Sequence, residues 1–111
     1  TSKIYDTKQS KTSPVVLAPR FASALQLPAR VQHKAAQIAW RARKRGLLGK
    51  KKPASVAAAA LYIACLLEGT PCTQLQIARV AGITQTTVKI RYRDLVKKLK
   101  IPKYALNRLK S

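Results

Sequence analysis

An uncharged, strongly apolar stretch lies near the middle of the chain, from Ala54 to Leu67. Its only polar side groups belong to Ser55, Tyr62 and Cys65, so no face of it has an evident need for water. A helix that is apolar on every side is normally a buried one. A proline precedes the stretch and a glycine follows it, as is typical of helix ends, and it is shorter than the roughly 20 residues needed to span a bilayer. We therefore predict a buried central helix around which an all-α domain is built.

Two amphipathic helices are predicted to precede the central helix. The first begins at Ser13-Pro14, a cap residue followed by proline, and its apolar residues recur at helical spacing to about Gln26. The inward stripe of the second has steps of four, three and four residues: Val31, Ala35, Ile38 and Ala42. Trp40 and His33 lie on the opposite side of that helix. Because tryptophan is highly buried on average, Trp40 is expected to pack against a neighbouring element rather than contact a partner.

Residues 73 to 99 carry the spacing of a helix-turn-helix. Thr73, followed three residues later by Gln76, fits the capping-box pattern that starts the first helix of the pair. Ala78 is small enough for two helices to cross closely, Gly82 supplies a tight turn, and Val88 is placed to be buried between the helices. A helical hairpin that does not bind DNA could have the same apolar positions. The residues on the outer face of the second helix therefore have to distinguish a DNA-binding helix-turn-helix from such a hairpin.

That outer face is suited to DNA. Thr84 can cap the helix, and by the 3.6-residue period one outward arc is shared by Thr86, Lys89, Arg93, Lys97 and Lys100. Short hydrogen-bonding side chains at the N-terminal end can approach base edges, whereas the lysine-rich C-terminal end suits phosphates. The predicted base-reading residues are Gln85, Thr86, Lys89 and Arg93. The predicted phosphate-binding residues are Thr73, Gln74, Thr84, Thr87, Arg91, Lys97, Lys50, Lys51 and Lys52. Of these, Arg91 lies off the outward arc.

The charge of the chain also points to a polyanionic partner. Lysine and arginine number 23 against three acids, Asp6, Glu68 and Asp94, which gives a formal net charge of +20. Such a charge costs self-repulsion in a compact state, and a bound polyanion relieves it. The segment from Arg41 to Lys52 holds seven basic residues and no acid, so it is predicted to contact phosphates rather than to be only a solvated loop.

The same composition argues against other chemistry. Three acids, one histidine and four glycines cannot supply paired carboxylates, a Ser/His/Asp set or a phosphate-cradling glycine loop, so the chain is not expected to be an enzyme. Cys65 and Cys72 are too few for a disulfide framework or a four-ligand zinc site, and no metal or cofactor is expected. The first residues lack the apolar region of a secretion signal, which predicts an intracellular setting.

Three segments of the sequence resemble a known family: KPASVAAAALYIA at residues 52–64, TQLQIA at 73–78 and GITQTTVKIRY at 82–92. They look like the second cyclin-like repeat of the general transcription factor B family, the archaeal factor and its eukaryotic counterpart. The resemblance covers residues 14–99. It implies a five-helix cyclin fold around a buried third helix, with the helix-turn-helix in its last two helices. The domain would span residues 13–101, between a flexible arm at 1–12 and a tail at 102–111.

The resemblance implies a function as well. In this family the helix-turn-helix enters the major groove upstream of the TATA box and reads the B-recognition element, beside TATA-binding protein on bent promoter DNA, and the full factor helps recruit RNA polymerase. The family's base-reading valine and arginine fall on Thr86 and Lys89. Lysine lacks the two-pronged geometry of arginine, so an altered base preference is expected. The look of the repeat favours an archaeal source.

The residues alone do not exclude two other classes of function. A basic cyclin-like scaffold would dock an acidic protein on the same arc, and a helical ribosomal protein would place it on RNA. Readers of single-stranded RNA usually stack bases on aromatic side chains, and this chain has only one phenylalanine, one tryptophan and four tyrosines. Double-stranded promoter DNA is therefore the preferred partner.

Overall fold

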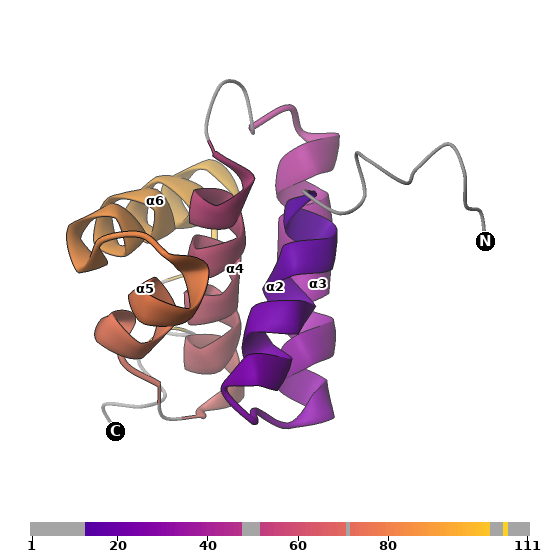
Figure 1. Ribbon diagram of the computed structural model, residues 1–111. Helices are drawn as coiled ribbons and strands as arrows, with labels where there is room; N and C mark the ends of the chain where they lie inside the picture. Colours follow the sequence, from indigo (N-terminus) through magenta and orange to yellow (C-terminus); the bar gives the residue numbers. More distant parts are fainter. Residues whose placement is uncertain (1–12, 48–51, 71, 103–105, 107–111) are drawn as a thin grey trace, which may run out of the picture.

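The computed structural model describes residues 13–47, 52–70, 72–102 and 106. Over these residues the only regular secondary structure is helical, in the order α2 (Pro14–Ala24), α3 (Ala29–Lys44), α4 (Pro53–Glu68), α5 (Gln74–Ala81) and α6 (Gln85–Lys98) (Figure 1). The predicted all-α, five-helix fold class is confirmed. The arm predicted at residues 1–12, Lys50, Lys51 and most of the predicted tail lie outside the described residues, and the domain limits stay a prediction.

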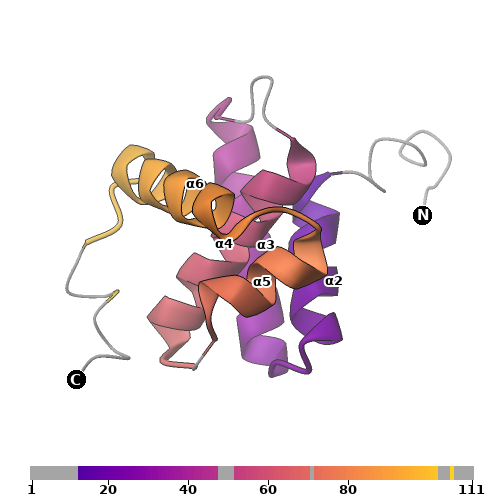
Figure 2. The same ribbon diagram turned by 60° about the vertical axis from the view of Figure 1, so that its left-hand side comes forward.

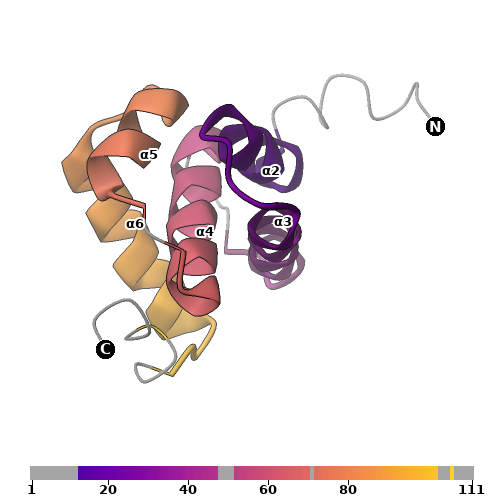
Figure 3. The ribbon, with the colours of Figure 1, turned by 90° about the horizontal axis from the view of Figure 1, so that it is seen from below.

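Helix α4 is the centre of the molecule, as predicted. It lies between the α2–α3 pair and the α5–α6 pair, which is clearest along its axis (Figures 1 and 3). Every residue from Ser55 to Leu61 is buried, and so are the four after Tyr62, because α4 meets other helices on nearly all its sides. The four alanines at Ala57–Ala60 are completely buried and leave room for those helices to approach closely.

Helix α2 starts where the sequence predicts and ends slightly earlier. The Ser13 hydroxyl accepts a hydrogen bond from the Val15 N–H at 3.2 Å, so Ser13 is the expected cap. Pro19 lies within the helix without ending it. The helix stops at Ala24 rather than near Gln26, because Gln26 adopts a left-handed conformation with φ of 58° that turns the chain toward α3.

Helix α3 confirms one prediction and corrects another. Its predicted stripe, Val31, Ala35, Ile38 and Ala42, is buried. Trp40, however, is 50% exposed, so the packing role expected for it is wrong. It lies on the side of α3 turned away from the core, and the ammonium of Lys44 lies 4.9 Å from its ring centre. His33 is exposed on the same helix.

Helices α5 and α6 cover the other side of α4. The rings of Tyr62 in α4 and Tyr92 in α6 meet edge to face, with centroids 4.8 Å apart and an interplanar angle of 89°. Burial in this contact raises the pKa of the Tyr92 hydroxyl above its ordinary value. Ile101 and Leu106, beyond the end of α6, are also buried against the core, so this end of the chain adds to the support of α6.

Candidate nucleic-acid interface

The helix-turn-helix has the local geometry that its sequence predicts. Thr73 and Gln76 form a reciprocal capping box, each side chain accepting the other's backbone N–H at 3.1 Å. The turn closes through a 3.0 Å hydrogen bond from the Ile83 N–H to the Ala78 carbonyl. Gly82 makes this possible, since its φ of 72° lies in the left-handed region. Helix α6 therefore leaves the turn in a fixed direction.

Replacing Gly82 with alanine should destabilise the domain by about 1 to 2 kcal/mol. A Cβ at this position would meet nothing within 4 Å, so the cost comes from the positive φ alone and not from a clash. Gly82→Asn is the matched control, because asparagine tolerates this conformation better, and it should recover part of the loss in urea unfolding. Equal losses for alanine and asparagine would contradict this cause.

Helix α6 begins with a hydroxyl pair. Thr84 accepts the Thr87 N–H at 3.1 Å through its side chain, and the two hydroxyl oxygens are 2.7 Å apart. Gln85 and Thr86 lie between them and are exposed. The cap therefore fixes the first turn of α6 and leaves two short polar side chains on its surface, where they can approach a partner.

The outward arc of α6 is present in the structure. Helix α6 lies on the outside of the bundle and crosses the face that is nearest in Figure 2. Four members of the predicted arc are exposed on α6: Thr86, Lys89, Arg93 and Lys97. Lys100 is also exposed, but it lies beyond the end of α6 with a left-handed φ of 56°, so its predicted place on the helical arc is wrong. Val88, Leu95 and Leu99, on the opposite side, are buried. The arc is thus a mainly polar and basic face along the helix, with the exposed side chain of Ile90 beside it.

A cleft lies on the other edge of α6, and the sequence pattern does not predict it. This cleft, of about 440 Å³, is lined by Lys52 at the start of α4, by Ser55, by the turn residues Gly82, Ile83 and Thr84, and by Thr87 and Arg91 of α6. Arg91 lies off the arc, as predicted, but here it joins three other predicted phosphate-binding residues. Its buried Nε has no hydrogen-bond partner within the described structure. Two cations and three hydroxyls in one cleft suit an anion.

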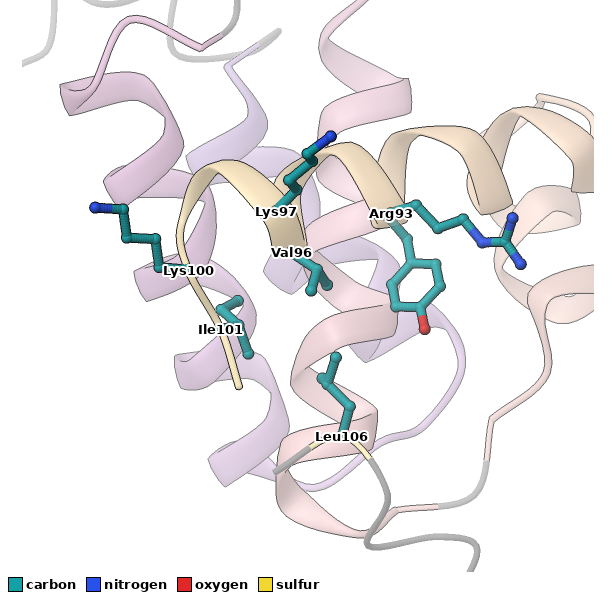
Figure 4. A pocket seen from close by; sticks show the side chains of 7 residues that line it. Arg93, Val96, Lys97, Lys100, Ile101 and Leu106 are labelled. Atoms are coloured by element: carbon teal, nitrogen blue, oxygen red, sulfur yellow. The ribbon is translucent and has the colours of Figure 1, made fainter. Parts of the chain in front are cut away.

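Another pocket lies at the other end of α6 and differs in character. It has a volume of about 850 Å³, and Tyr92, Val96, Ile101 and Leu106 supply its apolar walls. Figure 4 shows the charged ends of Arg93, Lys97 and Lys100 pointing away from one another at its edge. The basic groups therefore reach outward from the surface instead of converging inside the pocket.

The remaining predicted residues are less closely grouped. Gln74 shares a small cavity with Lys89 and Arg93, so the start of α5 adjoins the arc. Thr73 is exposed, with its hydroxyl engaged in the capping box. Lys50 and Lys51 lie outside the described residues, and nothing in the structure bears on their predicted phosphate contacts.

Ion pairing leaves the positive charge of this surface largely in place. Glu68 lies 3.6 Å from the Arg30 guanidinium, and Asp94 lies 3.6 Å from the Lys98 ammonium, one turn further along α6. With three acids in the whole sequence, most of the 23 cations have no carboxylate available to them. Among the described residues there is no cluster of three metal-binding side chains, and no helix long and apolar enough to cross a membrane.

The fold and this surface define a small helical protein built around a buried helix, with an exposed, basic helix-turn-helix. Residues 7–98 match the family model described as the transcription factor TFIIB repeat, and the chain belongs to that family. Members of this family are transcription initiation factors and not enzymes, which confirms the prediction that the chain is not an enzyme. The family resemblance predicted from the sequence is also confirmed.

Similar proteins named transcription initiation factor IIB occur in several archaea. The protein of Methanococcus maripaludis is 45% identical over 100 residues, which cover 90% of this chain and 30% of that protein. The protein of Pyrodictium occultum is 51% identical over 89 residues, covering 80% of this chain and 29% of its own length. The protein of Methanocaldococcus jannaschii is 46% identical over 94 residues, which cover 85% of this chain and 14% of that protein. The chain thus spans a third or less of these archaeal relatives, which support the predicted archaeal source.

Proposed function

We propose that this chain is the second cyclin-like repeat of an archaeal general transcription initiation factor and binds promoter DNA through its helix-turn-helix. Helix α6 would enter the major groove upstream of the TATA box, at the B-recognition element. TATA-binding protein would hold the adjacent bent DNA, and the full-length factor would help recruit RNA polymerase. The setting would be intracellular, in the archaeal cytoplasm or nucleoid.

The observation that carries this proposal is the exposed arc of α6. Its first turn presents Gln85 and Thr86. Lys89 lies three residues after Thr86, Arg93 lies four residues after Lys89, and both are on the same exposed face. A helix in the major groove reaches base edges with the side chains of one such face. These four residues are our proposed base readers.

The two edges of α6 would then contact the phosphates that border the groove. Lys97 lies toward the C-terminal end of the arc, while Lys52, Thr84, Thr87 and Arg91 surround the cleft on the other edge. Thr73 and Gln74, at the start of α5, would add contacts beside the arc. Contacts of this kind set position and general affinity, whereas the base contacts set sequence preference.

Fluorescence anisotropy with a labelled promoter duplex tests this function. The chain should bind the promoter more tightly than a duplex scrambled only upstream of the TATA box, and TATA-binding protein should increase the difference. Each titration is made at two salt concentrations, because phosphate contacts alone give steeply salt-dependent binding to any sequence. Equal binding to both duplexes, with and without TATA-binding protein, would reduce the proposal to a general polyanion-binding domain.

Lys97→Ala should weaken binding to all duplexes alike. Removing one phosphate contact should lower the slope of log affinity against log salt concentration by about 1 and leave the ratio between promoter and scrambled duplex unchanged. The measurement is a salt titration of both duplexes with wild type and variant. A changed ratio would assign Lys97 to base reading instead.

A protein-docking role is the second candidate, and Trp40 is the observation that favours it. The half-exposed ring borders a shallow, mostly apolar hollow on α3 and α2, far along the sequence from the helix-turn-helix. Exposed tryptophan is frequent at the centres of protein interfaces. If Trp40→Ala abolishes the effect of TATA-binding protein while binding of the chain alone persists, the two functions coexist on separate surfaces.

A further inference from the structure

The two cysteines of the chain meet in the folded protein. Cys65 lies in the last turn of α4 and is completely buried, and Cys72 lies immediately before Thr73, the cap residue of α5. Cys72 is partly exposed and packs against the hydrophobic core. The two side chains are neighbours, and each shifts the pKa of the other thiol.

The end of α4 brings them together. Gly69 adopts a left-handed conformation with φ of 69°, which reverses the chain, and the Thr70 N–H donates a 2.9 Å hydrogen bond to the Cys65 carbonyl. The chain thus returns along the last turn of α4 before α5 begins. This turn brings Cys72, seven positions further along the sequence, beside the side chain of Cys65.

The contact makes the two thiols chemically unequal. The neighbouring Cys72 side chain, together with burial, raises the pKa of the Cys65 thiol, whereas the Cys65 side chain lowers the pKa of Cys72. A partly exposed thiol with a lowered pKa beside a second thiol is the arrangement of a redox-responsive cysteine and its resolving partner. Neither thiol takes part in the DNA surface described above.

We propose that Cys65 and Cys72 form a reversible disulfide site that closes when the chain meets a low-molecular-weight disulfide. The Cys72 thiolate attacks one sulfur of a disulfide such as oxidised glutathione, forming a mixed disulfide and releasing one glutathione thiolate. Cys65 then attacks the Cys72 sulfur, and its proton passes to the second glutathione thiolate as that group leaves. The pair loses two electrons and two protons, and the oxidant is reduced to two thiols.

Closure would fasten the last turn of α4 to the cap of α5. Constraining the unfolded chain in this way stabilises the folded state, and a short loop gives an increase in Tm of several degrees. The inference does not depend on the proposed DNA-binding function, because its chemistry and its readouts involve neither the arc nor the cleft of α6.

Incubation of the full chain with oxidised glutathione tests the site by intact mass and by thiol counting. The wild type should lose the mass of two hydrogen atoms, keep no glutathione, show no free thiol and stay monomeric. Cys65→Ala should instead retain one glutathione on Cys72, and Cys72→Ser should react poorly, because its remaining thiol is buried. The oxidised wild type should melt several degrees above the reduced form, and dithiothreitol should restore the original mass.

The wild-type measurement stands on its own if a variant fails to fold. Two thiols that stay free after prolonged incubation, a stable glutathione adduct on the wild-type chain, or a disulfide formed only between chains would each overturn the proposal.

Discussion

Leu61→Ala is expected to lower the free energy of unfolding by about 2 to 5 kcal/mol, the largest effect on stability that we predict from a single substitution. Leu61 is completely buried in α4, and it is among the largest of the fully buried side chains. Three of its neighbours one turn away along the helix, Ala57, Ala58 and Ala64, are alanines, which have no further atoms with which to fill the space left by the leucine. The cavity would therefore persist, and urea unfolding should show the full loss.

Leu75→Ala is the control for this experiment. Leu75 lies on α5 and is 45% exposed, so the same chemical change should cost less than about 1 kcal/mol there. Similar losses at positions 61 and 75 would mean that the cost reflects the chemistry of truncation and not the central position of α4.

Lys89→Ala is expected to have the largest single effect on DNA recognition. Loss of one base contact should cost about 1 to 3 kcal/mol in promoter affinity, roughly five- to 150-fold, and should bring the affinities for promoter and scrambled duplexes closer together. Lys89 lies on the exposed arc, one turn beyond Gln85, the first residue of α6. The measurement is the same anisotropy titration, with the two duplexes compared at one salt concentration.

Lys98→Ala removes the same charge from the same helix and serves as the matched control. Lys98 lies off the arc and is paired with Asp94 at 3.6 Å, so its loss should change both affinities only slightly and equally. If Lys89→Ala and Lys98→Ala behave alike, the assignment of α6 as the recognition helix fails.

The central helix and the helix-turn-helix could be predicted because local chemistry determines both. A stretch without charge has to be buried whatever surrounds it, which is why α4 could be placed at the centre. The turn needs a residue that tolerates positive φ at Gly82, and the capping box at Thr73 needs only a partner three residues away. None of these inferences depends on how distant parts of the chain meet.

The features that could not be predicted from the sequence all depend on contacts between distant parts of the chain. Whether Trp40 is covered depends on which helices pack against α3, and average burial does not decide it. Arg91 lies off the arc of its own helix and joins a cleft only because α4 brings Lys52 to it. The cysteines looked unrelated because one belongs to a helix and the other to a loop, until the turn at Gly69 reverses the chain.

The buried alanines at the centre of α4 also limit how the domain can move. Alanine has no rotamers, so small displacements of the surrounding helices cannot be absorbed by side chains that adjust at this contact. Sliding of α4 against the α2–α3 pair or against α6 would produce clashes or empty space. We therefore expect the domain to dock as a rigid body, so that any mismatch of shape has to be accommodated by the partner.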